Sequence, residues 1–370
     1  MKYYIIAGEA SGDLHAANLM KSLLVEDTNA NFRFWGGDLM QKVGGTLVKH
    51  YRDLAFMGFL EVIMNLRTIT KNLAFCKKDI ASYNPDVIIY VDYPGFNLRI
   101  AQWARVKGYK NHYYISPQIW AWKENRIKAI KRDVDAMYVI LPFEKEFYEE
   151  KHNFPVHFVG HPLIDEIISR NPISPQDFRT QNNLDDRPII ALLPGSRKQE
   201  IQKMLEIMLS VTPDFKEYQF VIGGAPSQDQ EFYEPFLQKN RVHLLMNQTY
   251  NLLDVSYAAL VTSGTATLET ALFKVPEVVC YKGGKISYEI AKRVIKLNYI
   301  SLVNLIMNKE VVKELIQSEF NTKTLKTALT SILQEENRKT LFNSYYELEK
   351  NLGGRGASDK TAKLIFNSIS

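Results

Sequence analysis

The feature that most constrains the fold is a series of short apolar runs, each ending at small or polar residues and followed by a helical pattern. The clearest is Asp86–Val91, with the sequence DVIIYV, and Lys2–Ala7 and Ile189–Leu193 have the same form. Continuous runs of this kind are typical of strands buried on both faces of a parallel sheet. Strands that alternate with helices predict an α/β fold with doubly wound parallel sheets.

The strand–helix series occurs twice. The chain has 370 residues, which is long for one core and comfortable for two domains. Gly160-His161-Pro162 and the polar segment Asn171–Arg187 separate the two series, and the chain from Val311 onwards reads as helical. We expect an N-terminal domain over residues 1–165, a C-terminal domain over 166–345, and a final helical segment over 346–370.

Composition excludes several other classes of protein. Hydrophobic residues make up 46% and charged residues 24% of the chain, as in globular proteins. The two cysteines are far apart in apolar surroundings, which fits a reducing cytoplasm rather than a disulfide framework. The net charge of +5 is spread along the chain without a nucleic-acid-binding motif, so we expect no nucleic acid partner. No signal peptide and no apolar run of the ~18–20 residues that span a bilayer is found.

Ligands of parallel sheets bind at the carboxyl ends of the strands, and two such ends carry acidic residues. The loop Gly8–Asp13 is either a tight turn with a capping residue or a substrate loop that presents Glu9. Asp92 follows the buried strand Asp86–Val91, where apolar walls would raise the pKa of its carboxyl. Asp92 is therefore either a general base or the cap of the next helix.

Two further strand ends suit phosphate. In Pro194-Gly195-Ser196-Arg197 an arginine lies beside the start of a helix, and we favour an anion site over a plain loop with a surface arginine. Ser263-Gly264-Thr265 places amides and hydroxyls at another helix start, which suits a diphosphate, and Glu269 one turn later could accept from ribose hydroxyls. Capping by Ser263 or Thr265 is the alternative, and both roles can hold together.

A metal site is not expected. Asp133-Val134-Asp135 has acid-x-acid spacing, but it lies between an apparent helix end and a strand. The histidines form no H-x-x-x-H or H-E-x-x-H pair. His15 lies near the first loop without an assigned role, and His161 is expected to be structural.

The apolar stretch Phe56–Met64 admits two interpretations. It is either a buried helix or a partly exposed surface that receives acyl chains or rests on an anionic membrane. Five residues are the candidates for that surface: Met57, Phe59, Leu60, Ile63 and Met64.

Taken in order, the motifs resemble those of the lipid-A-disaccharide synthase family of bacteria. They extend from about Tyr4 to Gln317, which is most of the chain. The motifs are Ala7–Asp13, Asp92–Asn97, Ser116–Trp122, Gly160–Pro162, Leu193–Arg197, Ser263–Glu269 and Ser301-Leu302 with Asn304.

The resemblance implies two Rossmann-like domains facing across a cleft, the GT-B arrangement, with C-terminal helices packing back toward an N-terminal domain. The implied activity is metal-independent, inverting and without a cofactor. It transfers 2,3-diacylglucosamine from its UDP derivative to the 6-hydroxyl of 2,3-diacylglucosamine 1-phosphate. The implied location is the inner face of the cytoplasmic membrane, as a peripheral protein. Whether the last helix stays on its own subunit or is exchanged in a homodimer is left open.

The resemblance also distributes roles among the residues. Asp92 would be the general base, and Glu9 would lie near the acceptor or support the base. The residues implied to bind the UDP-sugar are Gly195, Ser196, Arg197, Ser263, Gly264, Thr265, Glu269 and Asn304.

Three rival functions share some of these features. The nearest is a UDP-sugar epimerase of the same two-domain plan, which would act on a water-soluble sugar. A two-lobed binding protein usually carries a secretory signal, which was not found here. A nicotinamide dehydrogenase is poorly supported, because Gly8-x-x-x-Gly12 lacks the third glycine and the ribose-binding acid of that motif.

Overall fold

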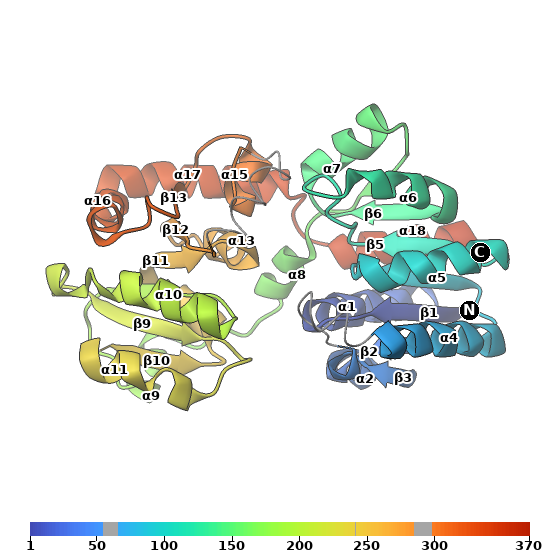
Figure 1. Ribbon diagram of the computed structural model, residues 1–370, viewed down its shortest axis with the longest axis horizontal. Coiled ribbons are helices and arrows are strands. Elements are labelled where there is room, and N and C mark those ends of the chain that lie inside the picture. Colours follow the sequence, from blue (N-terminus) through green and yellow to red (C-terminus); the bar gives the residue numbers. More distant parts are fainter. Residues whose placement is uncertain (55–65, 241, 285–297) are drawn as a thin grey trace. The chain divides into compact units, whose positions relative to one another are not determined.

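The computed structural model describes residues 1–54, 66–240, 242–284 and 298–370 (Figure 1). The chain forms two compact units. Unit 1 combines Met1–Glu166 with Leu352–Ser370, and unit 2 is Ile167–Asn351. Each unit contains a sheet of parallel strands with helices around it, so the predicted fold class is confirmed.

Unit 1 is built on a seven-stranded sheet in the order β3-β2-β1-β4-β5-β6-β7. The strands are β1 (Lys2–Ala7), β2 (Asn31–Gly36), β3 (Thr46–His50), β4 (Val87–Val91), β5 (Asn111–Tyr114), β6 (Ala136–Val139) and β7 (His157–Phe158). The helices are α1 (Ala10–Glu26), α2 (Asp38–Val43), α4 (Leu66–Tyr83), α5 (Pro94–Val106), α6 (Ile127–Asp133), α7 (Pro142–Glu146) and α18 (Ala357–Ile369). Short helical turns occur at η1 (Tyr51–Asp53), η2 (Glu124–Arg126) and η3 (Phe147–Lys151).

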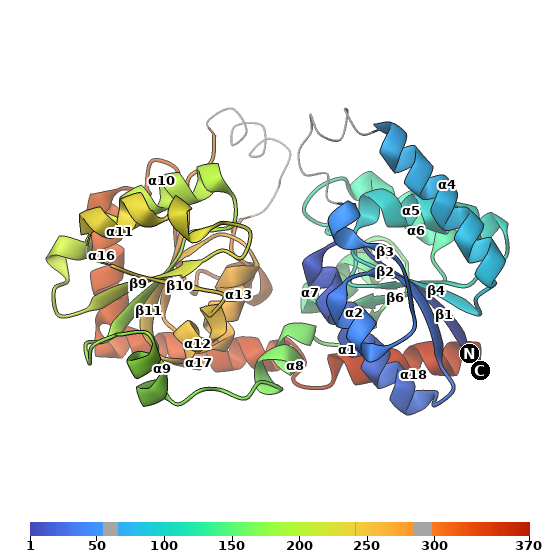
Figure 2. The ribbon, with the colours of Figure 1, turned by 90° about the horizontal axis from the view of Figure 1, so that it is seen from below.

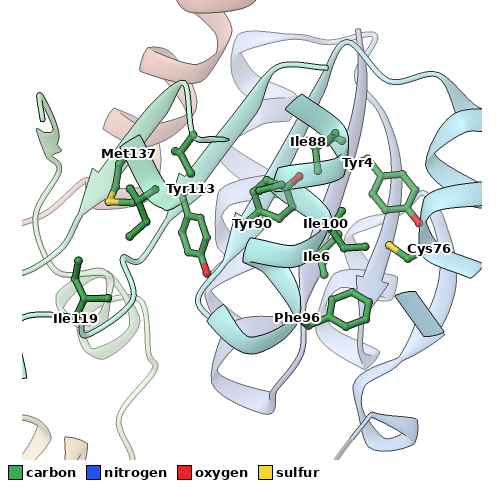
Figure 3. Close-up of a cluster of buried hydrophobic side chains, with 14 of the residues drawn as sticks. Tyr4, Ile6, Cys76, Ile88, Tyr90, Phe96, Ile100, Tyr113, Ile119 and Met137 are labelled. Atoms are coloured by element: carbon green, nitrogen blue, oxygen red, sulfur yellow. The ribbon is translucent and has the colours of Figure 1, made fainter. Parts of the chain in front are cut away.

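One face of this sheet packs against α4, α5 and α6. Side chains alternate along a strand, so Tyr4 and Ile6 of β1 point to the same face as Tyr90 of β4 (Figure 3). All three are fully buried, and each contributes roughly 1.5–3 kcal/mol of burial free energy. The tyrosine hydroxyls in this core are paired, since the Tyr90 hydroxyl donates to Asn111 over 2.8 Å. A tyrosine-rich core is therefore compatible with full burial.

The opposite face is covered by α1 and α18, which lie side by side (Figure 2). The carboxylate of Asp165 accepts from the backbone N–H of Gly356 over 2.7 Å, at the start of α18. Ser22 on α1 donates to Asp359 on α18 over 2.6 Å. The last helix is thus attached to unit 1 by polar contacts as well as by its buried side.

Unit 2 contains a six-stranded parallel sheet in the order β10-β9-β8-β11-β12-β13. Its strands are β8 (Ile189–Leu193), β9 (Gln219–Gly224), β10 (His243–Met246), β11 (Ser256–Thr262), β12 (Glu277–Tyr281) and β13 (Lys313–Ile316). Its helices are α9 (Pro175–Gln181), α10 (Lys198–Leu209), α11 (Glu234–Asn240), α12 (Thr249–Asp254), α13 (Thr265–Leu272), α15 (Leu302–Met307), α16 (Thr322–Leu333) and α17 (Glu335–Asn351), with turns η4 (Thr212–Asp214) and η5 (Gln230–Phe232). The short helix α8 (Pro162–Ile168) contains the boundary between the units.

The sequence pattern suggested that the chain is helical throughout after Val311, and this prediction is wrong. Residues Lys313–Ile316 form β13, which pairs in parallel with β12. Lysine, glutamate and leucine favour helices, but the position next to β12 overrides this propensity.

The first helix begins at Ala10, inside the segment Gly8–Asp13 that the sequence indicated as a loop. Neither Ser11 nor Asp13 caps it. The buried carboxylate of Asp13 accepts from the backbone N–H groups of Gly37, Leu39 and Met40, and so caps α2 instead. Within the described residues, no helix combines the length and apolar character needed to cross a bilayer.

Candidate functional site

In unit 1 the candidate site forms at the point where the strand order reverses. β1 pairs with β2 on one side and with β4 on the other. The chain leaves β1 through Glu9 and leaves β4 through Asp92, so these carboxylates follow neighbouring strand ends. Such a switch point is where open α/β sheets bind ligands.

The turn after β4 holds Asp92 in an unusual conformation. Asp92 and Tyr93 have φ angles of +44° and +49°, in the left-handed region that non-glycine residues avoid. Each such residue costs of order 1–3 kcal/mol, so surrounding contacts must hold it. The backbone carbonyl of Asp92 accepts from the Tyr113 hydroxyl over 2.6 Å and from the Asn97 side-chain amide over 2.7 Å. These two bonds fix the direction of the turn.

Asp92 is not the cap of the following helix. Tyr93 occupies the N-cap position of α5 and no side chain caps it. The capping alternative is therefore wrong. Burial, and next the nearby charge of Glu9, raise the pKa of the Asp92 carboxyl from 3.8 to about 6. A pKa in this range suits a group that must accept a proton near neutral pH.

Gly8 brings the two strand ends together. A Cβ atom at Gly8 would lie 2.3 Å from Cδ1 of Tyr93, so only glycine allows the tyrosine ring to pass over this backbone. Glu9 follows at the N-cap of α1 and is exposed. The sequence left a tight turn with a capping residue and a substrate loop as alternatives here, and the structure adds a close approach between two loops.

A cavity of about 630 Å³ opens beside these loops, entirely within unit 1. Glu9 and Tyr93 line it together with apolar side chains such as Leu54 and Phe96, and with Arg99. Its volume lies in the range of small-molecule sites.

In unit 2 the corresponding reversal lies between β8 and β11, which pair directly. Arg197 ends the loop after β8 and is the N-cap of α10. Gly195 in this loop has φ +104°, which requires glycine. The backbone carbonyl of Ser196 accepts from Ser227 over 2.9 Å and from Gln228 over 3.0 Å. The Arg197 guanidinium is exposed and has no acidic partner among the described residues.

The loop after β11 starts α13 without a side-chain cap. Gly264 is the N-cap, with φ +148°, so capping by Ser263 or Thr265 is wrong. The Ser263 hydroxyl donates to the carbonyl of Ile300 over 2.9 Å. Gly264 and Thr265 are exposed, which leaves the first amides of α13 open to an anion. Glu269 is partly buried and accepts from the Tyr250 hydroxyl over 2.8 Å.

Asn304 does not reach this surface. Its side chain is fully buried, and its amide donates to the carbonyl of Val312 over 2.8 Å and to Glu314 over 2.9 Å. Its oxygen accepts from the backbone N–H groups of Val311 and Val312. All of its polar groups are used within the protein, so the structure gives it a supporting role and no nucleotide contact.

The remaining candidates lie elsewhere or outside the described residues. Burial lowers the pKa of His15 to about 4 and that of His161 to about 3, so both are neutral at pH 7. Asp133 is paired with Arg132 and Asp135 with Arg105, and no group of three metal-ligating side chains occurs in the described part of the chain. The acyl-chain candidates Met57, Phe59, Leu60, Ile63 and Met64 all lie outside the described residues.

Several supporting residues had no distinct sequence signal. The Tyr113 hydroxyl donates to the backbone carbonyl of Asp92, and the Tyr250 hydroxyl donates to Glu269. Glu144 is fully buried and accepts from the Ser116 hydroxyl and from the Trp120 indole N–H. Only Ser116 and Trp120 lay in a motif that the sequence singled out.

Comparison with known proteins decides the family. The sequence matches the family described as Lipid-A-disaccharide synthetase over residues 3–366. The lipid-A-disaccharide synthase of Coxiella burnetii is 37% identical, covering 99% of this chain and 98% of its own. That of Syntrophus aciditrophicus is 36% identical, covering 99% and 97%. This chain belongs to the lipid-A-disaccharide synthase family. It is a glycosyltransferase of lipid A biosynthesis.

Solved structures with a similar fold include two kinds of enzyme. The UDP-GlcNAc 2-epimerase from Neisseria meningitidis has a TM-score of 0.62 at 12% identity, covering 100% of this chain and 99% of its own. A glycosyltransferase from Rickettsia africae has a TM-score of 0.57 at 12% identity, covering 100% and 98%. At this identity the likeness shows a shared fold of the GT-B type, and the full-length sequence similarity separates this chain from the epimerases.

Proposed function

We propose that this enzyme transfers 2,3-diacylglucosamine from its UDP derivative to the 6-hydroxyl of 2,3-diacylglucosamine 1-phosphate, with inversion at the anomeric carbon. The observation that carries the proposal is the strained, partly buried Asp92, whose pKa of about 6 suits a base. Unit 1 would bind the acceptor at the β1–β4 switch point, and unit 2 would bind the UDP-sugar at the β8–β11 switch point.

An inverting transfer needs one displacement and no protein nucleophile. The acceptor's 6-hydroxyl oxygen forms a bond to the anomeric carbon while Asp92 accepts the hydroxyl proton. The bond from the anomeric carbon to the diphosphate oxygen breaks, and UDP takes its electron pair. Glu9 keeps Asp92 a better proton acceptor by raising its pKa.

Negative charge gathers on the departing UDP and needs donors placed in advance. The Arg197 guanidinium and the open amides at Gly264 and Thr265 supply such donors from adjacent strand ends. Glu269, oriented by Tyr250, would accept from ribose hydroxyls.

The direct test is an assay of the purified chain with both acylated substrates, with products identified by mass spectrometry and with EDTA in a parallel reaction. We expect the β-1,6-linked disaccharide 1-phosphate and UDP, with and without EDTA. Turnover of UDP-N-acetylglucosamine to an epimer without disaccharide formation would identify an epimerase instead.

The nucleotide side is tested with Arg197→Ala. Loss of one such donor costs about 2.7–4 kcal/mol of transition-state stabilisation, so we expect kcat to fall by about 100–1,000-fold and UDP binding to weaken. Lys203→Ala, an exposed cation on the same helix, is the control. Unchanged UDP affinity in Arg197→Ala, measured by calorimetry, would remove Arg197 from the site.

The acylated substrates also suggest peripheral association with the inner face of the cytoplasmic membrane, through Met57, Phe59, Leu60, Ile63 and Met64. Changing Phe59 and Met64 to serine should reduce binding to anionic liposomes in a flotation assay while the unfolding midpoint stays the same. An unfolded variant would show instead that these side chains belong to the core.

A further inference from the structure

The cavity of unit 1 has two chemically different parts. Leu54, Ile69 and Phe96 form an apolar wall, whereas Arg52, Arg99 and Lys123 add positive charge. Glu9 is the single carboxylate among its lining residues. Arg52 is paired with Asp38, so Arg99 and Lys123 remain as uncompensated cations beside one carboxylate around an apolar space.

Arg99 carries one of these charges without compensation. It lies on the exposed side of α5, whose buried residues Phe96 and Ile100 are seen in Figure 3. No hydrogen bond or ion pair holds its guanidinium within the part of the chain that the structure describes. Arg52 differs, because it is paired with Asp38 over 3.1 Å.

Lys123 is held in place by its backbone and by its neighbour. Its φ of +57° lies in the left-handed region, where lysine is disfavoured. Its ammonium lies 4.2 Å from the ring centroid of Trp122, and no carboxylate pairs with it among the described residues. Lys123 also lines the cavity, and non-glycine residues in strained backbone conformations cluster at ligand-binding positions.

The loop that carries Lys123 is anchored by a buried carboxylate. Glu144 accepts from Ser116 and from the Trp120 indole, and its other oxygen accepts from the backbone N–H groups of Ile140 and Leu141. These bonds join the segment after β5 to the start of α7. The direction of the Lys123 loop is therefore set before a ligand arrives.

We propose that Arg99 and Lys123 form a binding site for the phosphate monoester of the acylated acceptor, whose apolar part lies against Leu54, Ile69 and Phe96. A phosphate monoester carries a charge of about −1.5 to −2 at pH 7, which matches the two uncompensated cations. Arginine and lysine are the residues that bind phosphate oxygens, and an apolar wall alone would not require them.

This inference rests on the proposed function for the identity of the ligand. Glu9 lines the cavity and lies close enough to Asp92 to raise its pKa, so the cavity adjoins the proposed base. In the acceptor's sugar ring, C1 bears the phosphate and C5 bears the carbon that carries the 6-hydroxyl, and both ring carbons flank the ring oxygen. Binding of the phosphate at Arg99 and Lys123 would orient the ring so that the 6-hydroxyl faces Asp92.

The kinetic test compares two acceptors, 2,3-diacylglucosamine with and without its 1-phosphate. The double variant Arg99→Gln/Lys123→Gln should lower kcat/KM for the phosphorylated acceptor by about 100-fold, as expected for two lost charge-assisted contacts. For the acceptor without phosphate its kcat/KM should match that of the unmodified enzyme, and KM for the UDP donor should not change. Lys107→Gln, an exposed cation just after α5, is the control.

Equal losses with both acceptors would overturn the inference, because the two cations would then act through the structure of the cavity rather than on the phosphate. No loss with either acceptor would overturn it as well. The single variant Lys123→Arg keeps the positive charge. It should distinguish the two acceptors better than the double variant does.

A binding measurement separates failure of this inference from failure of the proposed function. Calorimetric titration with monomeric decyl phosphate should show binding to the unmodified chain, weaker binding of inorganic phosphate, and loss of decyl phosphate binding in the double variant. If the double variant loses decyl phosphate binding but the unmodified chain makes no disaccharide, the phosphate site is supported and the proposed reaction is refuted. Disaccharide synthesis by an enzyme that neither distinguishes the two acceptors nor binds decyl phosphate would support the proposed reaction and refute the phosphate site.

Discussion

Asp92 unites a raised pKa with a strained backbone, and its titration should be visible in the kinetics. Since the base must be deprotonated, kcat/KM should fall about tenfold per pH unit below the folded-state pKa of about 6 and level off above it. Part of that raised pKa comes from Glu9. Glu9→Gln should therefore shift the acidic limb to lower pH.

The acceptor without its phosphate is the substrate of choice for this profile, because a phosphate monoester titrates in the same range. An acidic limb that stays in place in Glu9→Gln would show that another group controls the reaction.

The same environment means that the charged form of Asp92 lowers the free energy of unfolding. Its folded-state pKa of about 6 exceeds the ordinary 3.8, so the folded protein binds the proton more tightly than the unfolded chain. The charged form thus destabilises the fold above pH 6, by up to about 3 kcal/mol for a shift of about two units. Asp92→Asn removes the charge and tolerates a positive φ. We expect it to be inactive yet more stable at pH 7.5 in urea titrations.

This gain in the free energy of unfolding should shrink as the pH falls from 6 toward 4, because protonation then removes the penalty from the unmodified protein. A constant difference across that range would mean that the asparagine acts through packing or backbone conformation instead of charge.

Among single residues, positions after strand ends could be predicted from the sequence, but side-chain partners could not. Asp92 directly follows one apolar run and Arg197 ends the loop after another, so their places after strand ends could be predicted. Asn304 lies within α15 instead, where it is buried and bonded to Val311, Val312 and Glu314. Its partners lie up to ten residues away and no spacing rule points to them. The cap that Asp13 provides for α2 was missed for the same reason.

At the scale of elements, the buried strands were predictable, whereas the edge strands β3, β7 and β13 were not. Both faces of β1, β4 and β8 are buried, so successive positions in these strands favour apolar side chains. The strands can therefore be recognised in the sequence as apolar runs. The edge strands β3, β7 and β13 are short or contain charged residues, and only their pairing with a neighbour makes them strands. The order of strands, which creates both switch points, also depends on long-range contacts.

The contact between the β1–α1 and β4–α5 loops gives an element-scale prediction. Gly8→Ala would place a methyl group against the Tyr93 ring, 2.3 Å from Cδ1, and so displace the turn that carries Asp92. Overpacking of this kind costs about 1–3 kcal/mol, and we expect kcat to fall while UDP affinity is unchanged. Gly95→Ala in the same turn is the matched control, since its Cβ meets nothing within 4 Å. Equal kcat in the two variants would show that this contact does not position Asp92.

At the scale of the whole molecule, one of the two units is formed by two separate segments of the chain. Unit 1 takes its last helix from Leu352–Ser370, after the whole of unit 2. The sequence showed the break at Gly353-Gly354-Arg355-Gly356, because glycines interrupt the helical pattern there. Which unit receives the following helix depends on Asp165 and Ser22, whose bonds to Gly356 and Asp359 span 191 and 337 residues.

Attachment of α18 to unit 1 predicts that the two units respond differently to a change in this helix. Ile365 is fully buried, and Ile365→Ala should destabilise unit 1 by about 2–5 kcal/mol through lost burial and the cavity left behind. Amide hydrogen exchange should then speed up in β1, β4 and α1 but not in β8 and β11. Lys363→Ala, on the exposed side of the same helix, should leave both sets of amides unchanged. Faster exchange in β8 and β11 as well would show that the two units unfold as one, and that the last helix stabilises both.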